Sequence, residues 1–595
     1  MQTQSSATLA QQRPASARYT FHDLVGQRLA ANIEQWLLVA PQANLAMLEM
    51  FRDRDRLPRR DMVPWAGEFA GKYLTSAVLA WRISRDERLR TQLDRFVDEL
   101  ISVQADDGYL GPFPRDHRLT GKTADGKHAL WDLWGHYHCI LGLLLWYKEV
   151  GYRPALDACL RAADYICGRF LDTGERVRDA GAEEMNMSIS HALCLLYQET
   201  GEPRYLRMAR EVEADWQTPP AGDYVRQALA NVPFPQTPKP RWESLHDIQA
   251  ILSFYEITGN DSYRRAFEQI WHSIRAGDIH NTGGFSSGEQ ATGNPYDPGA
   301  IETCCTVAWM VVSVDMLRLT GDSRVADALE LSTMNATLGA QTPSGRWWTY
   351  NTPMDGVRKA SAHHIVFQAR EGSPELNCCS VNGPRSLALL SEWAVMQAPE
   401  GPVLNYYGPS SFDLDLPSGQ RVRLTQHTDY PTDGTIQIMV ELAQPADFTL
   451  SLRIPEWSQS TQVQINGETL PSPAAGQYLP LAREWHNGDV VQLTLDMSLR
   501  PWIGEREAAG KVCLYRGPLL LAYDRRFNTL DPDELPALDP SRLEGTPVNW
   551  AGGWPAPWLL LRVPTATGQD LTLCDFATAG AAGTPYLTWL PYQTE

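Results

Sequence analysis

The sequence predicts a two-part protein: an (α/α)6 barrel over residues 19–397, followed by antiparallel β-sandwich structure over residues 398–595. Three observations carry this prediction. A helical turn recurs through the first part, the interval between turns has room for two helices, and the hydrophobic period changes to two residues after about residue 400. At 595 residues the chain is also too long for one ordinary hydrophobic core, which favours more than one domain.

The recurring turns are centred on residues 85, 151, 201, 259 and 321. The last three contain Thr-Gly followed by Glu, Asn or Asp, with glycine ending one helix and the polar residue opening the next. A spacing near sixty residues fits two helices and their loops, so this part holds roughly six helical hairpins. Six hairpins closed into a ring form an (α/α)6 barrel with a central cleft; an open solenoid is the alternative.

The β-rich part is predicted from alternating apolar and polar residues in four segments, 422–425, 435–440, 448–454 and 490–495. Turns containing Pro, Gly or Asp separate them, as in an antiparallel sandwich. Asn466-Gly467 is typical of a tight hairpin turn. This region contains no evident catalytic cluster, so we expect it to pack on the barrel, and glycan binding is the weaker hypothesis.

Composition limits the partners of the protein. The net charge of −19 argues against a nucleic-acid binder, because phosphates would be repelled. No apolar run appears long enough to span a bilayer, so we expect no membrane partner. The abundance of Trp and Tyr is typical of sugar-binding clefts, although aromatic cores look the same. Such a cleft would bind a small oligosaccharide or glycoside, and a homodimer is left open.

The N-terminal residues 1–18 are polar and are expected to form a disordered lead. They contain no apolar stretch of the kind found in a secretory signal. Several cysteines lie inside helical patterns with no evident disulfide framework, which favours a reducing, cytoplasmic location.

Four residues in two short segments form a candidate metal site. Glu302 and Cys304 are two residues apart, so a strand or turn could direct both side chains the same way. Cys378 and Cys379 are adjacent, a poor spacing for a structural disulfide but workable for two ligands of one metal. Three thiolates and one carboxylate would suit Zn2+. The alternative is that these cysteines are small core hydrophobes.

Polar and aromatic clusters interrupt the helical pattern at corresponding positions in successive hairpins. Helices whose inner ends carry such groups would line one common cleft. Taken singly, each histidine is more often a hydrogen-bonded core residue, and Glu68 with Lys72 could be a surface ion pair. The candidate substrate-binding residues are Glu68, Tyr109, Trp134, His136, His138, Asn186 and His246.

Several longer motifs add to these clusters. In the first part they are 107–110 (DGYL), 282–289 (TGGFSSGE), 302–304 (ETC) and 378–385 (CCSVNGPR). In the second part they are 453–457 (RIPEW), 466–467 (NG), 485–489 (WHNGD) and 516–519 (RGPL). With these motifs, spread over nearly its whole length, the sequence resembles the β-L-arabinofuranosidase group of glycoside hydrolases, family 127 and its relatives.

The resemblance implies an (α/α)6 barrel followed by β-sandwich structure, with zinc held by one Glu and three Cys. Carried over by position, the zinc ligands would be Glu302, Cys304, Cys378 and Cys379. Cys378 would be the nucleophile and Glu289 the general acid/base. His138 and His246 would bind the substrate.

The sequence also departs from the family pattern around the expected sugar pocket. Asn186 stands where relatives carry a histidine, and Cys305 is an additional thiol beside a ligand. The cysteine pair continues with Ser380-Val381 instead of two prolines. The identity of the sugar is therefore less determined than the mechanism.

The expected activity is that of a retaining, exo-acting glycoside hydrolase, with L-arabinofuranose or a related plant sugar as the product. A zinc-bound cysteine stays deprotonated at neutral pH and can replace the usual carboxylate nucleophile. Two alternatives remain. One is an (α/α)6 sugar epimerase or inverting hydrolase that uses His and carboxylate catalysis beside a structural zinc. The other is a glycan-binding protein without turnover.

Overall fold

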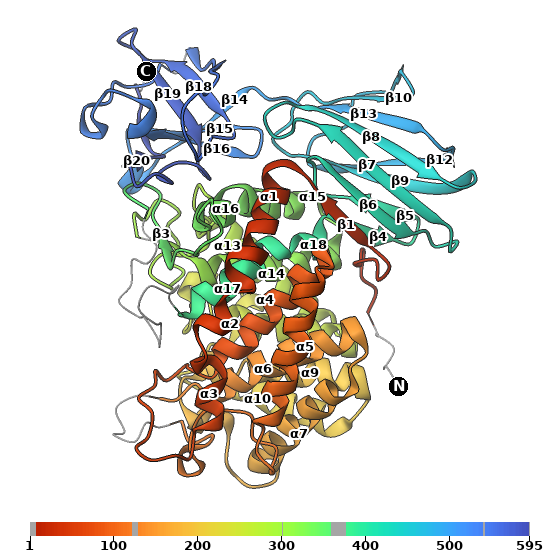
Figure 1. The fold of residues 1–595 in the computed structure, drawn as a ribbon, viewed down its shortest axis with the longest axis vertical. Coiled ribbons are helices and arrows are strands. Elements are labelled where there is room, and N and C mark those ends of the chain that lie inside the picture. Colours follow the sequence, from red (N-terminus) through yellow and green to blue (C-terminus); the bar gives the residue numbers. More distant parts are fainter. Residues whose placement is uncertain (1–6, 122–128, 300, 359–375, 540–541, 594–595) are drawn as a thin grey trace.

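The computed structural model describes residues 7–121, 129–299, 301–358, 376–539 and 542–593. A helical barrel makes up the lower part of the molecule in Figure 1, and two β units lie side by side above it. One is the sandwich and the other is a smaller sheet at the C-terminus.

The barrel is built around a closed ring of inner helices. Each contacts the next along the chain, and the last contacts the first, which excludes an open solenoid and confirms the (α/α)6 prediction. These helices are buried on almost every side because outer helices surround them. The inner helices are α4 (Glu68–Ser84), α6 (Asp132–Val150), α9 (Ile189–Thr200), α12 (Ser244–Thr258), α14 (Thr303–Thr320) and α17 (Cys378–Ala388).

The outer helices follow their partners in sequence and are amphipathic. For example, α13 buries Ala266, Phe267, Ile270, Trp271 and Ile274, which lie along one face at helical spacing. Helix α1 (Asp23–Asn32) contacts α17 and so completes the outer layer from the N-terminal end of the chain. The outer helices are α5 (Glu87–Ser102), α7 (Arg153–Phe170), α10 (Pro203–Asp215), α13 (Asp261–Gly277) and α15 (Ser323–Leu331).

All five predicted hairpin turns are present. Each turn residue has left-handed backbone, a conformation that glycine adopts without steric cost. The single non-glycine, Arg85, has φ +52°. The following helix is capped in four cases by an acid or amide side chain that accepts a backbone N–H, namely Asp86, Glu202, Asn260 and Asp322.

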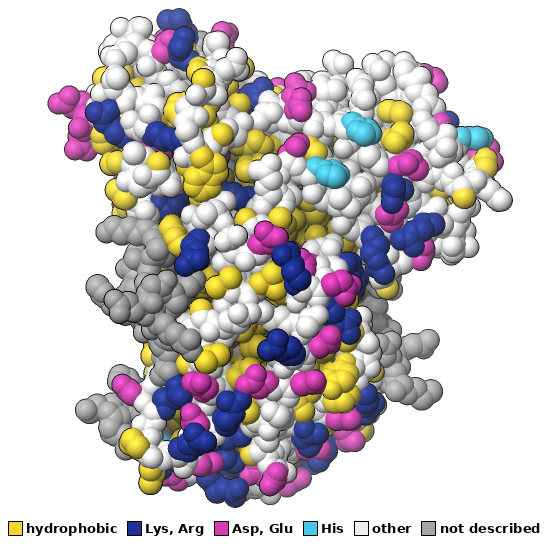
Figure 2. Space-filling view, in the orientation of Figure 1, with side chains coloured by type: hydrophobic (Ala, Val, Ile, Leu, Met, Phe, Trp, Pro, Cys, Tyr) yellow, Lys and Arg dark blue, Asp and Glu magenta, His cyan; other side chains and the backbone are white. Residues whose placement is uncertain are grey.

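Helix α14 is the one described helix that is long and apolar enough to span a membrane, which the sequence analysis did not expect. Its position in the inner ring explains that composition, because 83% of its apolar window is buried inside the protein. On the face shown in Figure 2, cationic and acidic side chains are interspersed over the barrel. Ion pairs one helical turn apart, such as Arg153–Asp157 on α7, occur on the outer helices.

The sandwich has two sheets. One runs in the order β1 (Arg18–Phe21), β6 (Ser410–Asp415), β7 (Arg421–Thr428), β8 (Thr435–Leu442), β13 (Asp489–Thr494), β10 (Gln462–Ile465), β11 (Glu468–Thr469). The other runs in the order β12 (Gln477–Trp485), β9 (Ala446–Ile454), β5 (Gly401–Leu404), β4 (Val395–Ala398). The four predicted segments lie in β7, β8, β9 and β13. Asn466 and Gly467 form the turn between β10 and β11, both with positive φ.

The C-terminal residues form a separate antiparallel sheet that sequence periodicity did not distinguish from the sandwich. Its main path runs β14 (Leu499–Ile503), β15 (Lys511–Arg516), β16 (Leu519–Asp524), β19 (Asp570–Asp575), β18 (Leu560–Pro564), β17 (Thr546–Pro547). Asn335 of the barrel accepts from the Leu520 amide at 2.8 Å and donates to the Pro518 carbonyl at 2.9 Å. These two bonds dock the sheet on the barrel.

The N-terminal lead is a correction to the sequence analysis. Residues 1–6 lie outside the described residues, but Gln12 pairs with Gln397 by two backbone hydrogen bonds of 2.9 and 2.7 Å. Farther along, β1 pairs with β6 of the sandwich over residues 18–21. The described part of this segment is therefore ordered by backbone pairing, which a polar composition does not reveal.

Candidate active site

The four predicted metal ligands come together at the N-terminal ends of two neighbouring inner helices. Glu302 is the N-cap residue of α14 and Cys304 lies in its first turn. Cys378 and Cys379 are the first two residues of α17. Both helix N-termini direct partial positive charge at the cluster, which favours thiolate and carboxylate groups there.

The donor atoms of these four residues all lie within 4.8 Å of one another, and all four side chains are buried. Cys379 Sγ lies 3.3 Å from Glu302 Oε1 and 3.5 Å from Cys304 Sγ. Cys378 Sγ lies 3.7 Å from Glu302 Oε1 and 3.8 Å from Cys379 Sγ. The arrangement could hold one metal ion.

Local backbone features fix the two halves of this cluster. The short strand β2 (Ile301–Glu302) pairs with β3 (Asn351–Thr352), which positions Glu302. On the other side, Asn377 and Ser380 form a capping box at the start of α17. The strand pairing and the capping box together determine the position of each pair of ligands at the N-terminus of its helix.

Pro384 inside α17 has no amide hydrogen, so the Ser380 carbonyl one turn earlier lacks its helical partner. The indole of Trp36 donates to that carbonyl at 2.6 Å. A residue far away in sequence thus completes the hydrogen bonding of the helix that presents Cys378 and Cys379.

Acid–base properties in the cluster follow from its burial. Desolvation, together with the nearby Cys378 charge, raises the pKa of Glu302 well above its usual range. Burial also opposes ionisation of Cys304, yet hydrogen bonds from Cys378 and Cys379 and the charge of Lys72 lower its pKa to about 6. Four acidic groups in one dry volume cannot all ionise without a compensating cation.

The additional thiol, Cys305, lies outside the group of four. It donates to Glu302 Oε2 at 3.6 Å, whereas Cys378 and Cys379 lie near the other oxygen, Oε1. Its position supports the carboxylate from behind the cluster.

Glu289 lies on a strained turn beside the cluster. Both Glu289 and Ser286 have left-handed backbone, with φ of +69° and +65°, which is uncommon for non-glycine residues and concentrates at functional sites. Arg241 donates to Glu289 Oε2 at 2.7 Å and to buried Glu243 at 2.8 Å. Glu289 keeps a side-chain exposure of 32%, so it is oriented yet remains accessible.

Glu68 and Lys72 form a buried ion pair at the N-terminal end of α4, not the surface pair that i,i+4 spacing also allowed. Lys72 Nζ lies 2.9 Å from Glu68 Oε2, and both side chains are 1% exposed. The ammonium lies over the rings of Trp134 and Trp242, and the Trp134 indole donates to Glu68. The sequence analysis named Lys72 only as a possible partner of Glu68 and did not include it among the site residues, yet its charge also acts on Cys304 and Cys378.

His138 and His246 present unused polar atoms in this region. Both ring nitrogens of buried His138 lack a hydrogen-bond partner among the described residues, as does Nε2 of His246. Tyr137 holds His246 through Nδ1 at 2.9 Å. The two rings are 5.5 Å apart and both contact Trp134. Buried unpaired nitrogens are costly, which is the signature expected where substrate hydroxyls bind.

Three other candidate substrate-binding residues form hydrogen bonds within the protein. His136 accepts from the Leu110 amide at 3.0 Å and contacts the Asp132 carbonyl at 2.9 Å. The Asn186 amide donates to two backbone carbonyls, at 3.0 and 2.7 Å. Tyr109 donates to the Asp132 carboxylate at 2.9 Å and is fully buried. They shape the loops around the site.

Two further residues near the cluster had little or no sequence signal. Tyr350 lies close enough to Cys378 and Glu302 that, after desolvation, their charges contribute to a strongly raised tyrosine pKa. Arg241 directly precedes the Trp242–Glu243 cluster, the one hint that it belonged to the site.

Comparisons with known proteins identify the family of the chain. The GH127 catalytic domain of beta-L-arabinofuranosidase matches residues 3–392, and the GH127 middle domain matches residues 403–497. The non-reducing end beta-L-arabinofuranosidase of Bifidobacterium longum subsp. longum is 26% identical over 508 residues, covering 77% of this chain and 75% of that protein.

Solved structures show the same fold. The GH127 beta-arabinofuranosidase BT3674 superposes with a TM-score of 0.79 at 22% identity, covering 98% of each chain. A GH127 beta-L-arabinofuranosidase from Geobacillus stearothermophilus T6 superposes with a TM-score of 0.75 at 20% identity, covering 97% of this chain and all of that one. The chain is therefore a glycoside hydrolase and belongs to family GH127.

Proposed function

We propose that the protein is a retaining, exo-acting hydrolase that releases β-L-arabinofuranosyl residues from the non-reducing ends of oligosaccharides. The family and the curated relative's activity support the sugar and the linkage. The observation that carries the mechanism is the buried group of three cysteine sulfurs and one carboxylate beside an oriented, accessible Glu289.

The donor set fits zinc better than a hard cation, because three of its four atoms are sulfur. Tetrahedral zinc with thiolate bonds of about 2.3 Å places sulfurs about 3.8 Å apart, close to the observed spacings. Glu302, Cys304, Cys378 and Cys379 would hold the ion. When bound, zinc supplies positive charge that keeps the cysteines deprotonated at neutral pH.

The chain's own residues then account for both steps. The Cys378 thiolate attacks the anomeric carbon while Glu289 donates its proton to the departing glycosidic oxygen, so the C–O bond breaks as a C–S bond forms. In the second step Glu289 takes a proton from water, which displaces the sulfur and regenerates the thiolate. His138 and His246 bind sugar hydroxyls through their free ring nitrogens.

We also place the enzyme in the cytoplasm, acting on imported oligosaccharides. All ten cysteines are free and buried in the structure, an arrangement that a reducing compartment preserves. A thiolate nucleophile would also survive best there.

The test is hydrolysis of 4-nitrophenyl β-L-arabinofuranoside, with the α-anomer as comparison and the product followed by proton NMR. We expect selective cleavage of the β-anomer with net retention, and loss of turnover in Cys378→Ala. Cys194→Ala is the matched control, since Cys194 is a buried thiol of α9 remote from the cluster. Inversion, or isomerisation without hydrolysis, would instead favour His and carboxylate catalysis beside a structural metal.

A further inference from the structure

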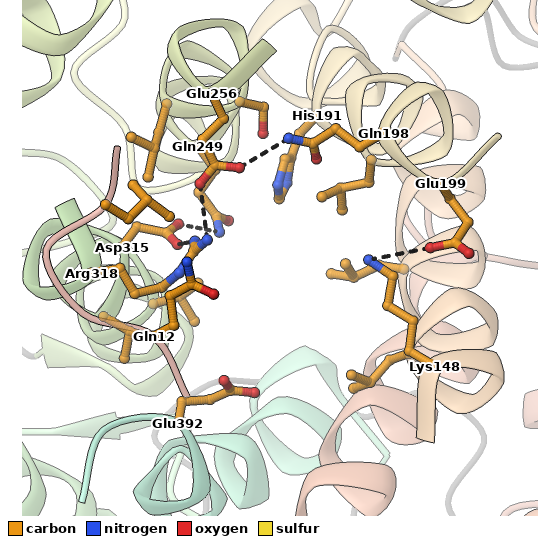
Figure 3. Close-up of a pocket in the computed structure, with 18 of the residues that line it drawn as sticks. Gln12, Lys148, His191, Gln198, Glu199, Gln249, Glu256, Asp315, Arg318 and Glu392 are labelled. Atoms are coloured by element: carbon orange, nitrogen blue, oxygen red, sulfur yellow. Dashed lines mark hydrogen bonds and ion pairs between the residues drawn. The ribbon is translucent and has the colours of Figure 1, made fainter. Parts of the chain in front are cut away.

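A second chamber, of about 700 Å³, lies at the other end of the barrel. Most of its lining residues come from the C-terminal halves of the inner helices, and Leu9 and Gln12 of the N-terminal segment also line it, whereas the cysteine cluster lies at the N-terminal ends of inner helices. Figure 3 shows the labelled polar side chains, among them Gln249, His191 and Lys148, arranged around its open centre. Leucines such as Leu79 and Leu145 supply apolar wall between them.

One cation facing this chamber has no partner. Arg385 lies on α17, is only 7% exposed, and forms no hydrogen bond or ion pair with any residue that the structure describes. Its buried Nε is unsatisfied as well. An unpaired buried guanidinium is unfavourable, so its retention at a chamber wall indicates a ligand that supplies the missing negative charge.

The other cations around the chamber already have acidic partners. Arg318 pairs with Asp315 at 2.8 Å and with Glu256 at 2.9 Å. Lys148 lies 4.0 Å from Glu199, and Glu392 pairs with Arg82 from outside the chamber. Among the described residues that line the chamber, Arg385 is therefore the cation without a direct acidic partner, although the charges of Glu392 and Asp315 act on it.

We propose that this chamber is a second binding site, for a small organic carboxylate whose carboxyl group pairs with Arg385. The planar guanidinium matches a carboxylate in a two-point interaction. A monoanion is favoured over phosphate, because Asp315, Glu256 and Glu392 border the same volume and repel a second negative charge. Gln249, Gln198 and the apolar wall contact the rest of the ligand.

This site is separate from the active site and does not depend on the proposed function. Arg385 follows Cys378 by seven residues on the same helix, an axial separation of about 10 Å. The Tyr137 hydroxyl lies between His191 and His246, 3.1 Å from the first ring and 2.9 Å from the second. This hydrogen-bonded series crosses the barrel between its two ends.

The experiment measures binding to the full-length protein by titration calorimetry and thermal unfolding. The probes are sodium D-glucuronate, sodium hexanoate, D-glucose and sodium chloride. We expect saturable one-to-one binding and a raised unfolding temperature with at least one carboxylate, and neither effect with glucose or chloride. Glucuronate and hexanoate distinguish a hydroxylated from an aliphatic ligand body.

Arg385→Met should weaken carboxylate binding at least tenfold while leaving the ligand-free unfolding temperature equal or higher, because it removes an uncompensated buried charge. Arg153→Gln is the control, a surface arginine whose loss should change nothing. Two outcomes would overturn the proposal: no carboxylate binding by the wild type, or unchanged binding in Arg385→Met. A fall of several degrees in ligand-free Arg385→Met would overturn it too, since it would assign Arg385 a structural role.

Discussion

Glu302, Cys304, Cys378 and Cys379 place four acidic groups close together in a buried cluster. A folded protein cannot bury that much negative charge without a cation or retained protons. The same electrostatics that make the cluster costly when empty would make it a strong metal site. Glu289 does not share this cost of buried charge, because it pairs with Arg241 and is partly exposed to solvent.

Replacing Glu289 with Gln should separate proton donation from nucleophilic attack. We expect hydrolysis of natural arabinosides, whose leaving groups need a proton, to fall by about 10²–10⁴. Aryl substrates with acidic leaving groups should lose much less in the first step. Comparing single-turnover rates for 4-nitrophenyl and methyl β-L-arabinofuranosides checks this, and equal losses for both would refute the acid role.

Glu243 should make stability depend on pH in an identifiable direction. Burial raises the pKa of Glu243 from 4.5 to about 7, despite the opposing charge of Arg241. The folded state then binds the proton more tightly, so stability falls as pH rises from about 4.5 to 7, by about 3 kcal/mol for this group. Glu243→Gln should remove that fall, as measured by urea unfolding at pH 5 and pH 8. Parallel pH profiles of stability for Glu243→Gln and the wild type would contradict this account. The exposed Glu456→Gln variant is the control, and its profile should run parallel to that of the wild type.

At the scale of elements, helix α17 contains an interior proline and also presents two of the predicted metal ligands. Its Pro384 frees the Ser380 carbonyl, which Trp36 satisfies. Trp36→Phe should therefore leave a buried carbonyl unpaired at a cost of about 1–3 kcal/mol.

Pro384→Ala restores an amide hydrogen that can bond Ser380 within the helix. In that background Trp36→Phe should cost clearly less, and a double-mutant cycle in urea measures the difference. Strictly additive effects would show that the indole bond does not compensate for the proline.

Much of the element layout could be predicted from the sequence, because turns and periodicity are local. The five hairpin turns depend on glycine or polar residues at helix ends, and Asn466-Gly467 determines its hairpin. The pairing of residues 12 and 18–21 with distant segments leaves no such local signal.

The candidate site, too, was predictable from the sequence only in part. The free nitrogens of His138 and His246 lie on predicted helices, whereas the four ligands lie at helix N-termini, where the sequence analysis expected a strand or turn for Glu302 and Cys304. Whether a given polar residue faces the pocket or holds a loop depends on tertiary hydrogen bonds, so the sequence alone does not reveal that His136 and Asn186 bond to backbone groups of loops.

For the whole molecule, the arginine of the motif at 453–457 has a structural role. Arg453, fully buried in the sandwich, pairs with Glu330 at 2.6 Å and with Asp327, both on helix α15 of the barrel. Tyr430 also donates to Glu330 at 2.6 Å. These bonds join sandwich and barrel, so the sandwich supports the catalytic domain.

Arg453→Met should destabilise the protein by about 3–5 kcal/mol, because two carboxylates would remain buried without their partner. Arg423→Met, which breaks an exposed pair with Asp413 on the same sandwich, should cost less than about 1 kcal/mol. Urea unfolding followed by tryptophan fluorescence compares them. Similar midpoints for both variants would argue against an energetic role for the buried pair.

The central claim, that Cys378 forms a covalent glycosyl intermediate, is tested most directly by trapping it. Glu289→Gln protein is incubated briefly with 4-nitrophenyl β-L-arabinofuranoside, quenched in acid, digested and analysed by mass spectrometry. We predict one pentosyl group on the peptide that contains Cys378, absent from the Glu289→Gln/Cys378→Ala double variant. A pentosyl group on a carboxylate residue, or released product with no adduct on any peptide under single-turnover conditions, would contradict the mechanism.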